Sequence, residues 1–135
     1  MLSKKAFEVM VRPVVSARKN ASARDIALQL MNGLYSGMPV TNDDGKVVGI
    51  ITEIDLLNAI VEGKELEKTV ASDIMTTEVI SVNPDMNLSE IIKIMNEKKI
   101  IRVPVVSKEG KLRGVVSRCD ILRAKIEPDF VITYM

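Results

Sequence analysis

The chain has 135 residues and a net charge of +1, and 47% of its residues are hydrophobic while only 3% are aromatic. This length allows one compact domain or two very small ones that share an aliphatic core, and the near-neutral charge argues against a chain-wide nucleic-acid surface. The absence of histidine and the single cysteine, Cys119, remove the common zinc sites, most acid–base catalysts and any internal disulfide.

Predicted secondary structure in the first half of the chain begins with a short β-branched run at residues 14–16. An amphipathic helix follows, with apolar residues at i, i+3, i+4 and i+7 from Ala23 to Leu30. Ser22 with Asp25 three residues later forms a capping box at the start of this helix. A strand, a glycine-containing turn, a second strand and a final helix are then predicted at residues 38–41, 42–45, 47–51 and 54–60.

The second half repeats this pattern after a shift of 65 positions, without a gap. The identical pairs include Met10 and Met75, Val14 and Val79, Ser16 and Ser81, Ile26 and Ile91, Pro39 and Pro104, Gly45 and Gly110, Gly49 and Gly114, and Asp55 and Asp120. The second copy is therefore predicted to have a first strand at 79–82, a helix from Leu88 capped by Asn87 with Glu90, and two further strands and a helix. The charged stretch Asn58–Lys68 between the copies is predicted to be helical.

Each copy is thus expected to be a β-α-β-β-α unit of the α/β (α+β) class. A unit this short buries too little surface to offset its conformational entropy, so two pseudo-symmetric copies are expected to pack as one module. Such packing creates two related clefts between the copies, and small ligands tend to bind at such interfaces. The net charge is zero from Met10 to Ile60 and +4 from Met75 to Lys125, so a bound anion should prefer the second copy.

The segment most indicative of chemistry reads Gly, two apolar residues, Thr or Ser, two variable residues and Asp, at 49–55 and again at 114–120. Because the chain leaves a strand and enters a helix here, the hydroxyl and the carboxylate lie at a helix N-terminus, where exposed N–H groups attract anions. The hydroxyl and amides can hold a phosphate and the carboxylate can accept ribose hydroxyls, which suits a nucleotide. The same spacing is also an ordinary N-cap, and taken alone it favours the cap.

The residues from Phe7 to Ile126 resemble a tandem pair of CBS domains, the regulatory module named after cystathionine β-synthase. The duplication, the Pro-Val strands, the glycine turns and both Thr/Ser-x-x-Asp motifs carry the resemblance, and residues 72–82 look like the segment that opens the family's domain. The resemblance implies a first domain at 7–68 that includes the linker helix, a second at 69–126, and a C-terminal tail at 127–135.

By resemblance, the regulatory ligand would be AMP, ADP, ATP or S-adenosylmethionine, bound in pockets that take their walls from both copies. Each Asp would hold ribose hydroxyls, each Thr or Ser would face phosphate, and the apolar residues before each Pro would enclose the adenine. One pocket would combine Thr52, Asp55, Ile80, Ile101, Arg102 and Pro104. The other would combine Ser117, Arg118, Asp120, Val15, Tyr35, Ser36, Gly37, Met38 and Pro39.

The two pockets are predicted to be unequal. Arg102 and Arg118 lie where the family often places phosphate-binding cations, although exposed arginines are commonly only solvated. Their counterparts in the first copy are Gly37 and Glu53, and Glu53 next to Thr52 would repel a phosphate. We therefore expect the pocket of Asp120 to prefer phosphate, and that of Asp55 to take a less charged ligand or to stay empty.

The function expected from the sequence is a regulatory CBS-pair protein that senses energy state or a metabolite, with no catalysis, metal or cofactor beyond its regulatory ligand. We expect a homodimer, with a regulated protein as a further partner. The first residues lack the apolar stretch of a signal peptide, and no apolar run approaches the roughly 18 residues of a membrane span, so a cytoplasmic location is expected. The alternatives are a ligand-free dimerisation or docking module and a nucleic-acid-binding protein that uses the basic second half.

Overall fold

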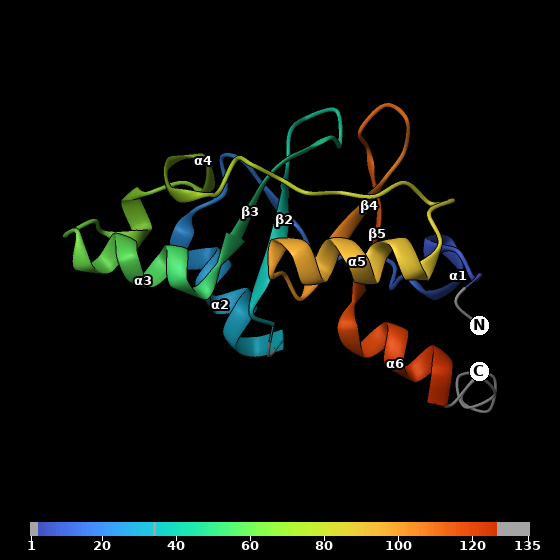
Figure 1. Cartoon of the computed structure of the whole chain (residues 1–135). Helices are drawn as coiled ribbons and strands as arrows, with labels where there is room; N and C mark the ends of the chain where they lie inside the picture. The colour runs from blue at the N-terminus through green and yellow to red at the C-terminus, as the bar shows by residue number, and fades with distance from the viewer. Residues whose placement is uncertain (1–2, 34, 127–135) are drawn as a thin grey trace. The chain divides into compact units, whose positions relative to one another are not determined.

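The chain folds into two compact units, each built from one sheet and the helices packed against it (Figure 1). The computed structural model describes residues 3–33 and 35–126, so the predicted tail at 127–135 lies outside the described residues. Unit 2 is the continuous segment Val15–Val79, whereas unit 1 combines Met1–Val14 with Ile80–Met135.

Unit 2 contains a three-stranded sheet in the order β1-β2-β3. Strand β1 runs parallel to β2, and β2 runs antiparallel to β3. Its elements in chain order are β1 (Ala17–Arg18), α2 (Ala23–Gly33), β2 (Gly37–Thr41), β3 (Val47–Thr52), α3 (Glu53–Val61), the 3-10 helix η1 (Leu66–Lys68) and α4 (Ala71–Ile74).

Unit 1 contains the corresponding antiparallel pair β4-β5. Where unit 2 has β1, unit 1 has a single parallel bridge between Val82 and Val105. The elements of unit 1 are α1 (Ala6–Val9), α5 (Leu88–Lys98), β4 (Arg102–Val106), β5 (Leu112–Ser117) and α6 (Arg118–Ile126). The predicted mixed α+β fold with two repeated units is therefore confirmed.

Both predicted helix starts are confirmed. The hydroxyl of Ser22 accepts hydrogen bonds from the backbone N–H groups of Arg24 and Asp25, at 3.2 and 3.4 Å. The side-chain oxygen of Asn87 accepts from the N–H of Glu90 at 3.0 Å. These bonds satisfy N–H groups that have no partner within the helix, so the polar residue before each apolar stripe sets where the helix begins.

Three sequence expectations were wrong in detail. The strand predicted at 79–82 is reduced to the single bridge between Val82 and Val105. The first strand lies at Ala17–Arg18 rather than at 14–16, because it is Ala17 and Arg18 that pair with Val40 and Thr41 of β2. The charged linker is not one helix. Helix α3 ends at Val61, and Gly63 adopts a φ of +85°, a left-handed conformation that ends helices and favours glycine.

The hydrophobic cores of the two units consist of the same nine positions, 65 residues apart. The core of unit 2 is formed by Ala17, Ala23, Ile26, Leu30, Met38, Val40, Ile51, Leu56 and Ala71. The core of unit 1 is formed by Ala6, Val82, Leu88, Ile91, Met95, Val103, Val105, Val116 and Ile121. The 65-residue shift relates Ala17 to Val82 and Leu56 to Ile121, and it relates the other core residues in the same way. For the alanine pair the order is reversed, because Ala6 belongs to unit 1 and Ala71 to unit 2. The register read from the sequence therefore relates the two cores to each other.

The segment that opens each sequence copy packs into the unit formed by the other copy. Met10 lies against Gly114 in unit 1 and Met75 lies against Gly49 in unit 2, and a Cβ added at either glycine would lie 2.5 Å from the methionine Sδ. Such a contact is too short, so both glycines are needed for this close packing. The compact units consequently differ from the sequence copies, and the predicted domain ranges 7–68 and 69–126 stay a prediction.

Candidate functional site

The first candidate carboxylate, Asp55, lies in the first turn of α3. The backbone N–H of Thr52 donates to Oδ2 of Asp55 at 2.9 Å, and the Thr52 hydroxyl donates to the same oxygen at 3.1 Å. Asp55 is partly buried. The strand β3 delivers Thr52 to the N-cap position of α3, so the hydroxyl, the carboxylate and the start of the helix meet at one point.

The second candidate carboxylate, Asp120, occupies the same place at the start of α6. The N–H of Ser117 donates to Oδ2 of Asp120 at 2.9 Å, and the N–H of Asp120 donates to the Ser117 hydroxyl at 3.2 Å. This reciprocal pair is a complete capping box. Both motifs therefore cap a helix, which is the alternative interpretation that the sequence analysis gave for this spacing.

The strands bring further predicted residues beside each motif, within one unit. In unit 2 the N–H of Glu53 donates to the carbonyl of Ser36 at 3.0 Å, and Gly37 pairs with Thr52. In unit 1 the N–H of Arg118 donates to the carbonyl of Ile101 at 3.0 Å, and Arg102 pairs with Ser117. The residues before each Pro-Val pair therefore lie next to the Thr or Ser of their own unit.

The remaining predicted site residues lie on or next to the same sheets. Val15 precedes β1 and is half-buried, as is Ile80 at the start of the second segment of unit 1. Three residues are buried within strands: Met38, Pro39 and Pro104. Each of the two predicted pockets combines residues of both units, and this crosswise grouping stays a prediction.

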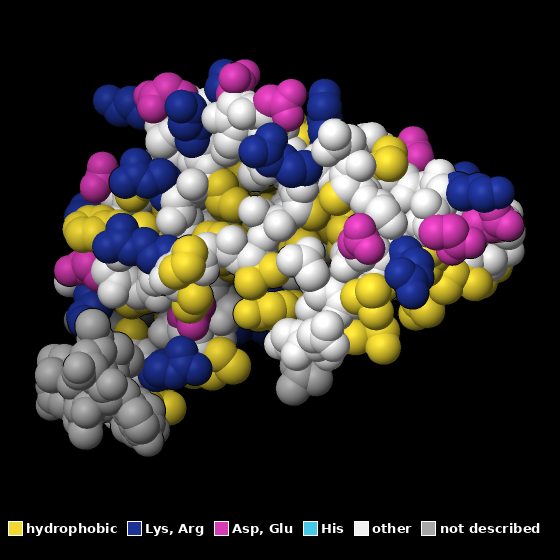
Figure 2. Space-filling model, turned by 180° about the vertical axis from the view of Figure 1, so that it is seen from behind, with side chains coloured by type: hydrophobic (Ala, Val, Ile, Leu, Met, Phe, Trp, Pro, Cys, Tyr) yellow, Lys and Arg dark blue, Asp and Glu magenta, His cyan; other side chains and the backbone are white. Residues whose placement is uncertain are grey.

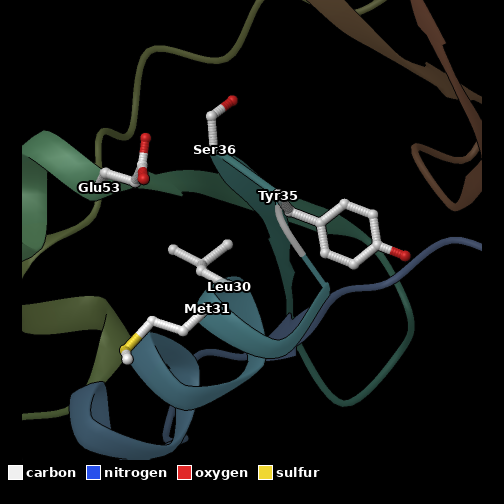
Figure 3. Close-up of a pocket in the computed structure, with 5 residues that line it drawn as sticks. All are labelled: Leu30, Met31, Tyr35, Ser36 and Glu53. Atoms are coloured by element: carbon white, nitrogen blue, oxygen red, sulfur yellow. The ribbon is translucent and has the colours of Figure 1, made fainter.

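A small pocket lies in unit 2 between the end of α2, the start of β2 and the start of α3. Its volume is about 240 Å³, and it is lined by Leu30, Met31, Tyr35, Ser36 and Glu53. Glu53 and Ser36 lie above Leu30 and Met31 in the view of Figure 3, and the Tyr35 ring points away from Glu53. Glu53 therefore borders a pocket whose lower side, in this view, is formed by the apolar residues Leu30 and Met31. Met31 was not identified from the sequence, because it continues the apolar pattern of the helix.

One functional candidate was missed by sequence reasoning. Nη1 of Arg123 donates to Oδ1 of Asp120 at 3.1 Å, forming an ion pair between residues three apart on α6. The i, i+3 spacing of an acid and a base on a predicted helix was the available signal. The pairing gives Asp120 a cationic neighbour within its own helix.

Other kinds of site find no support in the part of the chain that the structure describes. Within residues 3–33 and 35–126, no group of three or more His, Cys, Asp or Glu side chains could hold a metal ion. No helix in those same ranges is both long and apolar enough to cross a membrane. On the face shown in Figure 2, basic and acidic side chains are interspersed, and several hydrophobic side chains gather along the lower right of the view.

Comparison with known proteins finds the same module. A family model described as the CBS domain matches residues 6–62 and again residues 71–127. An uncharacterized protein of Methanopyrus kandleri is 37% identical over 134 residues, which cover 98% of this chain and 67% of that protein. An uncharacterized protein of Methanocaldococcus jannaschii is 33% identical over an alignment of 151 residues, which covers 88% of this chain and 89% of that protein.

Solved structures with the same fold include two that hold adenosine compounds. The CBS domain pair of protein MJ0100, in complex with 5′-methylthioadenosine and S-adenosyl-L-methionine, has a TM-score of 0.79 and 28% identity and covers 90% of this chain and 95% of its own. The protein CBSX2 in complex with AMP has a TM-score of 0.80 and 25% identity, with 93% and 98% covered.

Proposed function

Because the chain belongs to the CBS domain family, we propose that it is a regulatory module that binds an adenosine ligand and carries out no reaction of its own. The observation that carries this proposal is the repeated site, a carboxylate held by a backbone N–H at the start of a helix in each unit. The complexes of MJ0100 and CBSX2 with adenosine compounds support it.

The residues suit the parts of such a ligand. A carboxylate accepts hydrogen bonds from ribose hydroxyls, and a hydroxyl with helix N-terminal amides accommodates phosphate. Arg118 is exposed beside Ser117, where a charge-assisted hydrogen bond to phosphate is available, whereas exposed Glu53 takes that place beside Thr52. We therefore propose AMP, ADP, ATP or S-adenosylmethionine as the ligand, with phosphate favoured at Asp120.

Ligand binding would act on a protein partner by shifting the relative stability of two arrangements of the module. Couplings of this kind are typically about 1–3 kcal/mol, which is enough to bias a partner without catalysis. The module would thus report an energy state or a metabolite level to the protein that it regulates.

The test is calorimetry of the whole chain with AMP, ATP and S-adenosylmethionine. We expect saturable heat with at least one of them, and a loss of about tenfold or more in affinity for Asp55→Ala or Asp120→Ala, since a hydrogen bond to a charged group contributes about 1.5–3 kcal/mol. Asp73→Ala is the matched control, because the Asp73 carboxylate caps α4 by accepting from the N–H of Val70 at 3.0 Å and lies outside the site. No heat and no thermal shift at millimolar ligand would refute the proposal.

A second candidate function, ligand-free dimerisation, is favoured by the helix surfaces. Large apolar side chains on α3 and α6 are more than half exposed, namely Ile54, Leu57, Ile60, Val61, Leu122 and Ile126. Exposed apolar surface of this extent marks interaction sites in soluble proteins. We propose a homodimer through these faces, and analytical ultracentrifugation of Leu57→Lys should show a monomer where the parent chain is dimeric. A dimer that forms without any nucleotide binding would favour this second function alone.

A further inference from the structure

The two candidate carboxylates differ in how many of their oxygens are engaged. Within its own unit, Asp55 receives both of its hydrogen bonds on Oδ2, from the N–H and the hydroxyl of Thr52 at 2.9 and 3.1 Å. Asp120 receives one bond on Oδ2, from Ser117, and a second on Oδ1, from the Arg123 guanidinium at 3.1 Å. Among the residues that the structure describes, Oδ1 of Asp55 therefore accepts no hydrogen bond, whereas each oxygen of Asp120 accepts one.

The cause is a single difference between the copies. The 65-residue shift places Asn58 opposite Arg123, so that α3 carries a neutral side chain where α6 carries a cation. The side chain of Asp120 is only 10% exposed, while that of Arg123 is 46% exposed. The guanidinium can therefore move into solvent at small cost, but the carboxylate stays in place.

A ligand hydroxyl that binds Oδ1 of Asp120 must share this oxygen with the Arg123 guanidinium or displace it. We propose that Arg123 is a specificity-determining residue of the Asp120 site, which weakens the binding of neutral nucleosides by occupying the oxygen that a ribose hydroxyl would use. This inference rests on the proposed nucleotide-binding function. A ligand phosphate gives the displaced guanidinium a new charged partner, whereas a nucleoside gives it none.

The expected size of the effect follows from the exposure of the pair. Ion pairs near the surface are weak, because solvent screens them and because ordering two side chains costs entropy. Releasing Arg123 from Asp120 should therefore change affinity by about two- to fivefold. The effect should vanish for ligands that lack the ribose hydroxyls.

The experiment exchanges Arg123 of the second copy with its counterpart Asn58 of the first copy. Arg123→Asn is made in an Asp55→Ala background, so that only the Asp120 site reports, and Asn58→Arg is made in an Asp120→Ala background. Calorimetry uses adenosine, which carries no charge, and 2′,3′-dideoxyadenosine, which lacks both hydroxyls. We expect Arg123→Asn to tighten adenosine binding about two- to fivefold and Asn58→Arg to weaken it by a similar factor, with dideoxyadenosine unaffected.

Arg113→Asn is the matched control, since Arg113 is an exposed arginine of the same unit and its removal changes the net charge equally. Unchanged adenosine affinity in Arg123→Asn, or an equal gain with dideoxyadenosine, would overturn the inference while leaving the proposed function intact. If the parent chain binds none of adenosine, AMP, ATP and S-adenosylmethionine, the proposed function is refuted and the inference with it. Thermal melting of each variant separates a folding defect from a change in specificity.

Discussion

Units 1 and 2 share one backbone plan and one set of core positions but carry opposite charge. Unit 1 has thirteen Lys and Arg residues and eight Asp and Glu residues, for a net charge of +5, whereas unit 2 has six and ten, for a net charge of −4. Since charge affects association and ligand choice rather than fold, the duplication has kept the buried positions alike and has let the surfaces diverge.

The contrast is larger than the sequence copies indicated. The copies differ by four charges, but the opening segment of each copy belongs to the other compact unit. Lys4, Lys5 and Arg12 therefore join the basic unit, while Asp73 and Glu78 join the acidic one. The exchange of segments concentrates the charge of each unit.

The strongest test of core equivalence truncates the same position in each unit. Ile26 and Ile91 stand 65 residues apart and both are 0% exposed. Each substitution to alanine should lower the free energy of unfolding by about 2–5 kcal/mol, through lost apolar burial and the cavity left behind. Urea denaturation measures both, and Met31→Ala, at a side chain that is 70% exposed, should change stability by less than about 0.5 kcal/mol. A large loss at only one of the two positions would contradict the equivalence of the cores.

The charge difference at the sites is tested by exchanging Glu53 and Arg118. Glu53→Arg should raise ATP affinity and Arg118→Glu should lower it, each by about tenfold, because charge-assisted hydrogen bonds to phosphate are gained or lost. Calorimetry with ATP measures the change, and adenosine should be nearly insensitive to both substitutions. Glu67→Arg alters the charge of unit 2 equally at an exposed residue of η1. The same gain from Glu67→Arg would mean that net charge, and not the site, sets the preference.

The smallest expected difference lies in the helix caps. Asn87 accepts from the N–H of Glu90 at 3.0 Å, whereas Ser22 accepts at 3.2 and 3.4 Å. Because shorter bonds satisfy the helix N–H groups better, Asn87→Ala should cost about 1 kcal/mol of unfolding free energy and Ser22→Ala less. Thermal melting of the two variants gives the comparison, and a larger loss for Ser22→Ala would contradict it.

Much of the candidate site could be predicted from the sequence. The spacing of Thr52 with Asp55, and of Ser117 with Asp120, identified both helix N-termini and the hydrogen bonds across them, because these contacts are local. The Arg123 contact was equally local but was overlooked, since an acid and a base three apart on a helix usually form an exposed pair of little consequence. The bounds of β1 were not predictable, because a two-residue strand depends on its partner β2 rather than on its own composition.

By itself, the sequence determined the repeat, the helix caps and the glycine turns, because these follow from residue type and spacing along the chain. The tertiary structure alone decided which unit takes each opening segment. Ala6 and Ala71 are interchangeable in the pattern, and both are fully buried, so periodicity cannot tell which sheet each will join. That choice depends on contacts between residues far apart in the chain, such as the bridge from Val11 to Val115, and it is this choice that separates the charges of the two units.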